Sequence, residues 1–417
     1  MSSYVISSGP EFGHAVIKLP WSKSLVNRIL MLHRIAGLPL DKLESYCDCQ
    51  DSLDLFHALQ SGQARICVGE GAAPYRFMLA LMSAEHRRIT LDASGSMLQR
   101  NISPLVDALN DAGAEIRYAG TVGNPPVIIE KGLPDFQALS IDTSVSSQFA
   151  SALMLVAPLF PGEKIIHTRG KRVSEPYLKM SAALMECYGV RATHDACKAE
   201  IQISPGMYQQ PDLIPLEADW SAAAFFYTLS VLNPRCSIAL EGLYRPSLQG
   251  DSALPELFAG LGVQTKWIQL GGILLQGQAQ PVALPALIDF SDIPDLLPAF
   301  LVACAVRKVQ IKVCGVAHLA QKESNRLAML AKNFSNMGVA FYPEEASWVM
   351  DARPFNLPDN LHIETGNDHR MAMAFATLAV IKPIVLDNIQ CTAKSFPGFW
   401  DQLKKCNLSI EQHPYGV

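Results

Sequence analysis

One apolar pattern recurs along this 417-residue chain at a nearly constant spacing, and it restricts the possible folds. The pattern is a quartet of apolar residues at helical spacing (i, i+3, i+4, i+7). Four copies are followed by glycine and a small or β-branched residue, at Gly113, Gly189, Gly262 and Gly338. Glycine there is typical of a helix end that turns into a strand. The spacings of 76, 73 and 76 residues therefore predict a repeated helix-turn-strand unit.

The full set of copies sets the number of units. Quartets begin at Ile102, Leu254, Leu327 and Phe396, with a weaker copy at Leu178 and a fragment at Leu55. About six units of roughly 70 residues fill the chain, which favours two lobes of three units. Solenoid repeats of about 20–50 residues are too short to explain this period. The alternative is coincidence, because amphipathic helices ending in glycine are common.

Composition limits the class of protein. Apolar residues make up 49% and charged residues 18% of the chain, as in an ordinary globular enzyme. The net charge of -5 argues against bulk nucleic-acid binding but allows a local cationic pocket. No basic start followed by an apolar stretch opens the chain, and its longest apolar stretches are too short to span a membrane. A cytoplasmic protein is expected.

The ten cysteines are expected to be reduced thiols in such a protein. Cys47 and Cys49 form a CxC pair, and His194 precedes Cys197 by three residues. Neither pair has a second half at metal-ligand spacing, so no metal site is predicted.

In the first half, short segments join charged or hydroxyl residues to helix-start signals. In LPWSKSLVNRIL, Ser22 or Ser24 is predicted to cap a helix, with Lys23 and Arg28 near its N-terminus. Such an end with added cations is a natural anion site, although a capped surface helix is the alternative. The segments that follow supply Arg76, Arg100, Ser146, Ser147, Gln148, Ser174 and Tyr177.

The second half concentrates charge at predicted helix starts. DFSDIPDLLPAF places Asp289, Asp292 and Asp295 in an otherwise apolar segment, where a carboxylate is costly unless paired. The segments KESNRLAML, GNDHRMAMA and CTAKSFP add Lys322, Glu323, Arg326, Asp368, His369, Arg370 and Lys394. Helix capping is the alternative for each segment, and Asp368 in particular suits it.

The ordered set of motifs resembles the EPSP synthase family. The motifs are SKSLVNR, QRNISPLVDAL, SVSSQF, VSEPY, DFSDIPD, KESNR, NDHRMAM and CTAKSFP, from about Leu19 to Phe399. The resemblance implies an α/β (α+β) fold of two lobes, each with three βαβαββ repeats. Residues 21–217 would form the N-terminal lobe, and residues 1–20 and 218–417 the C-terminal lobe. The crossings near Trp21 and Glu217 would form a hinge, with substrates in the cleft between the lobes.

The resemblance also implies a transferase of the shikimate pathway, which supplies aromatic amino acids. The implied reaction moves the enolpyruvyl group of phosphoenolpyruvate to the 5-hydroxyl of shikimate 3-phosphate and releases phosphate. No cofactor or metal is implied, and the family is usually monomeric. Matching positions for shikimate 3-phosphate are Lys23, Ser24, Arg28, Ser146, Ser147, Gln148, Ser174, Tyr177, Asp295 and Lys322. Those for phosphoenolpyruvate are Lys23, Ala72, Arg100, Gln148, Arg326, Arg370 and Lys394.

The implied chemistry requires a base at the 5-hydroxyl and an acid at C3 of phosphoenolpyruvate. Asp295 would accept the hydroxyl proton, and Glu323 would deliver a proton to C3. Lys23 would share either role. His369 would orient Glu323 or the leaving phosphate.

Three segments depart from the family pattern. Trp21 replaces a glycine before SKS, Ala72 and Ala73 replace a Gly-Thr pair, and His318 stands where some members have asparagine. These changes motivate one alternative, an inactive homologue with a binding or regulatory role. The other alternative is UDP-N-acetylglucosamine enolpyruvyl transferase. Against it, this chain has SKS in place of GKN and no cysteine between Cys67 and Cys187.

Overall fold

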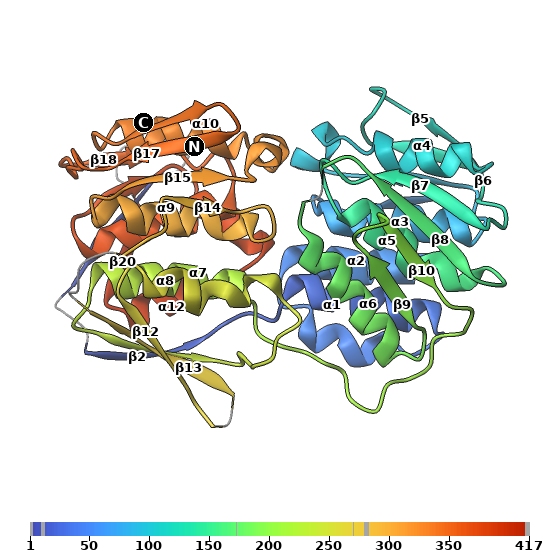
Figure 1. Ribbon diagram of the computed structural model, residues 1–417, viewed down its shortest axis with the longest axis horizontal. Coiled ribbons are helices and arrows are strands. Elements are labelled where there is room, and N and C mark those ends of the chain that lie inside the picture. The colour runs from blue at the N-terminus through green and yellow to red at the C-terminus, as the bar shows by residue number, and fades with distance from the viewer. Residues whose placement is uncertain (1–2, 10–12, 172, 270, 279–282, 413–417) are drawn as a thin grey trace. The chain divides into compact units, whose positions relative to one another are not determined.

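The chain divides into two compact units. The computed structural model describes residues 3–9, 13–171, 173–269, 271–278 and 283–412 (Figure 1). Unit 1 combines Met1–Pro20 with Glu217–Val417, and unit 2 is the continuous segment Trp21–Leu216. Among the described helices, none is both long and apolar enough to cross a membrane.

Five four-stranded sheets of one topology form in the described residues, with orders β3-β4-β6-β5, β7-β8-β10-β9, β12-β13-β11-β2, β14-β15-β17-β16 and β18-β19-β1-β20. In each sheet one pair of neighbouring strands is parallel and the other two pairs are antiparallel. In four of these sheets a helical segment connects the parallel strands, because a parallel crossover needs a long connection. The parallel strands β2 and β11 are also separated by the whole of unit 2. The predicted α/β class with βαβαββ repeats is confirmed.

Unit 2 contains two complete repeats and a helical segment. The strands are β3 (Arg65–Cys67), β4 (Ile89–Asp92), β5 (Glu115–Tyr118), β6 (Val127–Lys131), β7 (Ala138–Asp142), β8 (Lys164–Arg169), β9 (Ala192–Asp195) and β10 (Glu200–Ile203). The helices are α1 (Lys23–Ile35), η1 (Asp41–Tyr46), α2 (Gln50–Gln60), α3 (Ala72–Ala84), η2 (Gly95–Gln99), α4 (Ser103–Asp111), α5 (Gln148–Val156), η3 (Ala157–Leu159) and α6 (Glu175–Cys187). In place of a third sheet, the segment before β3 is helical, since it lacks the alternating β-branched pattern of strands.

Unit 1 closes its sheets with strands from the start of the chain. Its strands are β1 (Tyr4–Ser8), β2 (His14–Lys18), β11 (Ser237–Glu241), β12 (Val263–Trp267), β13 (Gly272–Gly277), β14 (Leu287–Asp289), β15 (Gln310–Cys314), β16 (Ala340–Glu344), β17 (Ser347–Asp351), β18 (Leu361–Ile363), β19 (Ile384–Leu386) and β20 (Leu408–Gln412). β1 pairs between β19 and β20, and β2 pairs in parallel with β11. Unit 2 is thus inserted within the repeat that β2 begins.

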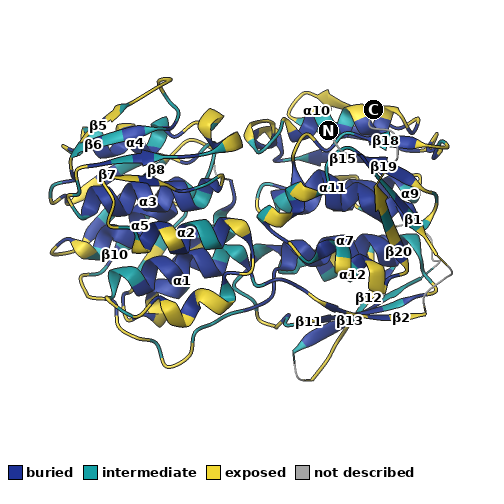
Figure 2. Cartoon of the chain, turned by 180° about the vertical axis from the view of Figure 1, so that it is seen from behind, coloured by how far each residue is buried: buried dark blue, intermediate teal, exposed yellow. Residues whose placement is uncertain are grey.

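The helices of unit 1 are α7 (Trp220–Leu232), η4 (Gly250–Ala253), α8 (Leu254–Ala259), η5 (Pro294–Leu296), α9 (Leu297–Val306), η6 (Ala317–Gln321), α10 (Arg326–Ser335), α11 (His369–Ala376), η7 (Thr377–Val380), η8 (Gln390–Lys394) and α12 (Phe399–Lys405). The first α-helix of each complete repeat, namely α3, α5, α7, α9 and α11, is buried on nearly all sides (Figure 2). A helix that is apolar all round belongs in such a core.

The quartets found in the sequence fall on the second helix of each repeat. They lie on or at α4, α6, α8, α10 and α12, and the fragment lies on α2. These helices bury one face only, and an amphipathic stripe is what a periodicity search detects. Gly113, Gly189, Gly262 and Gly338 all have positive φ, from 71° to 100°, as predicted for helix ends. After α12 the same place is taken by Asn407 with φ 54°, a residue that tolerates this conformation.

Candidate active site

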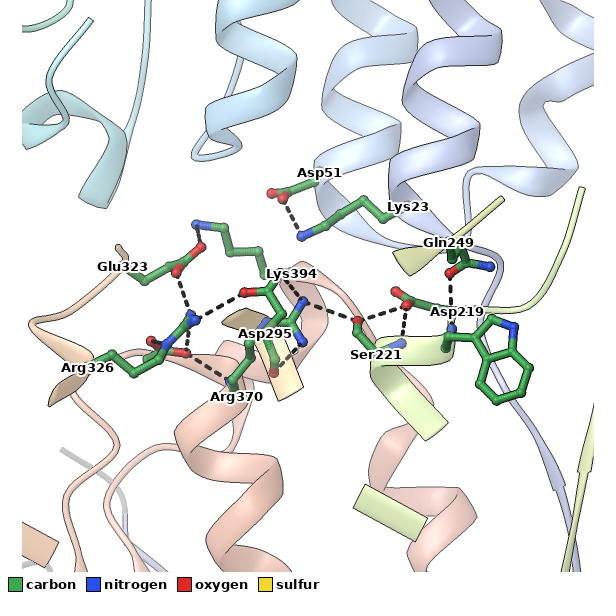
Figure 3. A network of polar contacts seen from close by, with 12 residues as sticks. Lys23, Asp51, Asp219, Ser221, Gln249, Asp295, Glu323, Arg326, Arg370 and Lys394 are labelled. Carbon is green, nitrogen blue, oxygen red and sulfur yellow. Dashed lines mark hydrogen bonds and ion pairs between the residues drawn. The ribbon is translucent and has the colours of Figure 1, made fainter. Parts of the chain in front are cut away.

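In unit 1, one buried arginine binds three carboxylates. Arg326, the first residue of α10, is 1% exposed. Its Nε donates to Asp368 at 2.8 Å, its Nη1 to Asp295 at 3.2 Å and its Nη2 to Glu323 at 2.9 Å (Figure 3). The guanidinium therefore brings the two predicted acid–base carboxylates, Asp295 and Glu323, onto a single cation.

A second arginine holds the other side of Asp295. Arg370 Nη2 donates to Asp295 Oδ2 at 3.0 Å and to the Ser221 hydroxyl at 3.2 Å. Burial alone would raise the pKa of Asp295, but Arg370, Lys322 and Arg326 outweigh it and hold that pKa well below its usual value. Asp295 is therefore a carboxylate, and a weak base, while these cations surround it.

Helix N-termini create this cluster. Asp368 caps α11 by accepting the Arg370 backbone N–H at 2.9 Å, and Asp219 caps α7 by accepting the Ser221 N–H at 2.8 Å. Asn325 caps α10 through the Ala328 N–H. The capping role expected for Asp368 is present, and its carboxylate also pairs with Arg326. Three helix N-termini add partial positive charge beside the arginines, which favours bound anions.

The remaining predicted residues of unit 1 surround this cluster. Lys394 at the end of η8 places Nζ 4.0 Å from Glu323 Oε1, and Lys322 directly follows η6. His369 is the first residue of α11 and is 1% exposed. Asp289 accepts hydrogen bonds from Ser291 at the surface, and Asp292 is exposed.

In unit 2, Arg28 occupies the centre of a helix bundle. It is 1% exposed, and its Nε donates to Ser181 of α6 at 2.7 Å, while Nη2 donates to Ser151 of α5 at 3.2 Å. Nη1 donates to the carbonyl of Ser24, one turn back on α1. Burial lowers the pKa of Arg28 to about 10. In the part of unit 2 that the structure describes, hydroxyls and carbonyls bind this cation and no carboxylate pairs with it.

The N-terminal turns of α1, α5 and α6 meet around Arg28 and carry the other predicted residues. Ser147 precedes α5 and is buried, and Gln148 begins that helix. Ser174 precedes α6 with φ 57°, in the left-handed region that is strained for serine. Tyr177 lies in the first turn of α6, and the centre of its ring is 5.8 Å from the guanidinium carbon of Arg28. The arrangement suits an anion with several hydrogen-bond acceptors.

Arg76 orients two of these residues. Its Nη1 donates to Ser146 Oγ at 3.1 Å and to Gln148 Oε1 at 2.7 Å, while its guanidinium lies 4.2 Å from the centre of the Phe149 ring. Arg76 therefore supports neighbouring polar side chains.

Lys23 is the first residue of α1 and pairs with Asp51 of α2 at 2.9 Å (Figure 3). Ser22 stands at the N-cap position, but its hydroxyl does not cap the helix. Ala72 is the first residue of α3 and is 9% exposed, and Arg100 follows η2. Trp21 packs edge-on against Tyr46 at 5.4 Å and binds Asp48 through its backbone N–H.

His318, Cys47 and Cys49, which the sequence also pointed out, are all buried. His318 is a buried residue of η6. Cys47 and Cys49 are free and buried, and burial raises their thiol pKa values to about 12 and about 11. Both are therefore protonated thiols at neutral pH.

Five polar residues of these sites were not singled out from the sequence, namely Asp51, Asp219, Ser221, Gln249 and Asp251. Asp51, Gln249 and Ser221 bond to residues far along the chain, as Ser221 does to Arg370, 149 positions away. The one local signal was EADWSAA, which contains Asp219 and Ser221 as an N-cap pair.

The structure combines a repeated α/β fold with buried arginines, helix N-termini that favour anions, and two carboxylates on one arginine. This combination defines an enzyme that acts on small polyanions. Comparison with known proteins makes this specific. Residues 59–403 match the family EPSP synthase (3-phosphoshikimate 1-carboxyvinyltransferase). The chain therefore belongs to the EPSP synthase family, as its motifs indicated.

Individual relatives support the same conclusion. A 3-phosphoshikimate 1-carboxyvinyltransferase of Bacteroides fragilis is 34% identical over 408 residues, which cover 97% of this chain and 98% of the relative. Another from Methanospirillum hungatei is 32% identical over 320 residues, covering 76% and 73% of the two chains. The structure of EPSP synthase from Acinetobacter baumannii has a TM-score of 0.75 at 20% identity, covering 99% of this chain and all of the other, so it shows the same fold.

Proposed function

We propose that this enzyme transfers the enolpyruvyl group of phosphoenolpyruvate to the 5-hydroxyl of shikimate 3-phosphate and releases phosphate. The observation that carries the proposal is the shared guanidinium of Arg326, which binds both Asp295 and Glu323. One anion-binding cation thereby connects the base and the acid that the reaction requires.

We assign phosphoenolpyruvate to Arg326, Arg370 and Lys394, together with Lys23, Ala72, Arg100 and Gln148. Shikimate 3-phosphate is assigned to the residues around Arg28, with Lys23, Asp295 and Lys322. Two features support the assignments: Arg28 is a buried cation bonded to neutral groups, and the arginines of unit 1 are held by carboxylates that a substrate anion would replace.

Binding of phosphoenolpyruvate would prepare the base. An anionic group of the substrate on Arg326 and Arg370 neutralises the cations that depress the pKa of Asp295, so this pKa rises and the carboxylate becomes a stronger base. The same replacement releases Glu323 from Arg326. Asp295 and Glu323 would thus become active only when substrate is present.

The reaction would proceed by addition and elimination. The 5-hydroxyl oxygen attacks C2 while its proton passes to Asp295, and C3 takes a proton from Glu323. The C2–O bond to phosphate then breaks, C3 returns its proton to Glu323, and the leaving phosphate takes the proton held on Asp295. In our assignment, Lys23, Lys394 and His369 would stabilise the departing phosphate.

Phosphate release with different acceptors tests the proposal. The purified enzyme should release phosphate from phosphoenolpyruvate only when shikimate 3-phosphate is added. Release with UDP-N-acetylglucosamine instead would identify the other enolpyruvyl transferase. No release with either acceptor would favour an inactive homologue. We further propose that the protein is cytoplasmic, monomeric and does not bind nucleic acid. Light scattering of the pure protein would check the monomer, and DNA-binding assays would check nucleic-acid binding.

Glu323→Gln should lower turnover by about 10²–10⁴-fold with little loss of substrate affinity, because it removes a transferable proton and keeps the shape of the side chain. Single-turnover kinetics and equilibrium binding of shikimate 3-phosphate would measure the two effects. Glu364→Gln, at an exposed ion pair with Lys332, is the control. Wild-type turnover in Glu323→Gln would remove this residue from the mechanism.

The methyl group of Ala72 should weaken inhibition by glyphosate. In this family glyphosate occupies the phosphoenolpyruvate site, and it is slightly longer than phosphoenolpyruvate. One added methyl in a packed site costs about 1–3 kcal/mol, or roughly 5- to 150-fold in affinity. Ala72→Gly should therefore lower the glyphosate inhibition constant more than it changes the KM for phosphoenolpyruvate. Ala73→Gly, at the next position of α3, is the control. Pro74, the third residue of α3, gives an alternative in which this turn is reshaped and the Ala72 methyl points away from the inhibitor. Tight competitive inhibition of the unmodified enzyme would support that alternative.

A further inference from the structure

Asp251 is a buried carboxyl group that the assignment above does not use. It lies in η4, is 5% exposed, and its Oδ1 finds no hydrogen-bond partner among the described residues. Buried polar atoms are nearly always hydrogen-bonded, so an exception calls for an explanation.

The segment that carries Asp251 is firmly held. The side chain of Gln249 accepts the Trp220 backbone N–H at 3.1 Å and donates to the Ala218 carbonyl at 2.8 Å and to Glu217 at 3.2 Å. These bonds attach the start of η4 to the N-terminus of α7 (Figure 3). The position of the Asp251 carboxyl is thus imposed by its surroundings and does not result from a loose turn.

Asp251 lies within the electrostatic reach of the cluster of unit 1. The charged groups that act on it are Asp295, Arg370, Asp219 and Lys322. On α8, which also packs against η4, Glu256 is exposed to solvent. Asp251 therefore faces two anions and two cations, and both cations already lie close to Asp295.

The pKa values of Asp251 and Asp295 are shifted in opposite directions. Burial, together with the charge of Asp295, raises the pKa of Asp251 well above its usual value, whereas the pKa of Asp295 is depressed. Divergent environments of this kind keep one carboxyl ionised and the other neutral. Since Arg370 is already bound to Asp295 at 3.0 Å, an ionised Asp251 would add a second negative charge beside it.

We propose that Asp251 is a positioning residue that remains neutral near Arg370, so that it does not offset the positive charge that this guanidinium presents to an anionic group of phosphoenolpyruvate. Ionisation of Asp251 would compete with the substrate for Arg370. This inference rests on the proposed function, since it takes Arg370 as a ligand of phosphoenolpyruvate.

The protonation state can be tested without activity. A carboxyl that is neutral when folded and ionised when unfolded stabilises the fold below its unfolded pKa of about 3.9, and this stabilisation is lost as the pH rises. Relative to Asp251→Asn, the wild-type unfolding constant should rise about tenfold per pH unit above pH ~5, until the pH reaches the folded pKa of Asp251. Urea denaturation of both proteins from pH 5 to pH 8 measures this ratio. Glu256→Gln is the matched control, and a ratio that stays constant with pH overturns the neutral carboxyl.

The functional consequence is tested by the KM for phosphoenolpyruvate in the phosphate-release assay. Asp251→Asn should keep the KM of the wild type near pH 7, because the amide is a neutral group of the same shape. At pH values where Asp251 ionises, the wild-type KM should increase relative to that of Asp251→Asn, toward about tenfold, which corresponds to ~1.4 kcal/mol. Titration of the substrate itself cancels in this ratio, and kcat should change in parallel in both proteins.

Two outcomes would contradict the link to Arg370. One is a tenfold higher KM of Asp251→Asn at pH 7, and the other is an identical pH dependence of KM in both proteins. Asp251→Ser, a smaller neutral side chain, replaces Asp251→Asn if that variant does not fold. If the enzyme releases no phosphate with any acceptor, the proposed function fails, while the denaturation experiment still decides the protonation state.

Discussion

Asp295→Asn should lower kcat by about 10²–10⁴-fold while substrates still bind. Asparagine keeps the shape of the side chain and can still accept one hydrogen bond from Arg326 or Arg370, but it cannot take the proton of the 5-hydroxyl. The structure adds a second expectation. Removing one negative charge leaves both arginines more strongly positive, so phosphoenolpyruvate should bind at least as tightly as it does to the wild type.

Single-turnover phosphate release and equilibrium binding of phosphoenolpyruvate separate these two effects. Asp292→Asn is the matched control, because Asp292 is an exposed aspartate on the same segment. Its kcat should remain near that of the wild type. An Asp295→Asn enzyme with wild-type kcat would show that another group accepts the proton, whereas parallel losses of kcat and affinity would point to a binding role.

Arg326→Leu should destabilise the fold by about 3–5 kcal/mol and abolish turnover. The guanidinium is the shared partner of three carboxylates, and the side chain of Asp368 is 0% exposed. Removing one member of a buried ion pair leaves an uncompensated charge, which is more costly than the net contribution of the pair. Urea denaturation at neutral pH would measure the loss of unfolding free energy.

Arg353→Leu is the control for charge alone. Arg353 pairs with Asp351 at the surface with 65% of its side chain exposed, and such pairs contribute about 0–1 kcal/mol. If Arg326→Leu were no less stable than Arg353→Leu, the three carboxylates would have to be satisfied without Arg326. Arg326→Lys should recover part of the stability and little of the activity, because an ammonium group cannot bind three carboxylates in one plane.

The sequence alone determined the repeat and the family. Helices such as α4 and α10 carry a stripe of apolar residues because they bury one face, and the stripe is visible without any structure. The glycine after each helix is visible for an equally local reason, since the chain must adopt positive φ there. The order of short motifs then sufficed to indicate the EPSP synthase family, which the comparisons confirm.

Two features of the fold were beyond sequence reasoning. The inner helices, such as α7 and α9, are apolar on all sides, and a uniform pattern has no period to detect. The first segment of unit 2 keeps helices α1 and α2 but forms no four-stranded sheet in the described residues, although three repeats were predicted there. The fragmentary quartet at Leu55 was the one sign of this difference.

For the site, the sequence supplied the residues and the tertiary structure decided their partners. Arg326 and Glu323 are three positions apart, so their pairing on one helix start follows from local geometry. Asp295 and Asp368 reach the same guanidinium from 31 and 42 positions away, and Ser181 reaches Arg28 from 153 positions away. Asp251 carries no local signal, because its charge state depends on burial and on the field of Asp295. Electrostatic interactions act through space, and only the folded chain sets those distances.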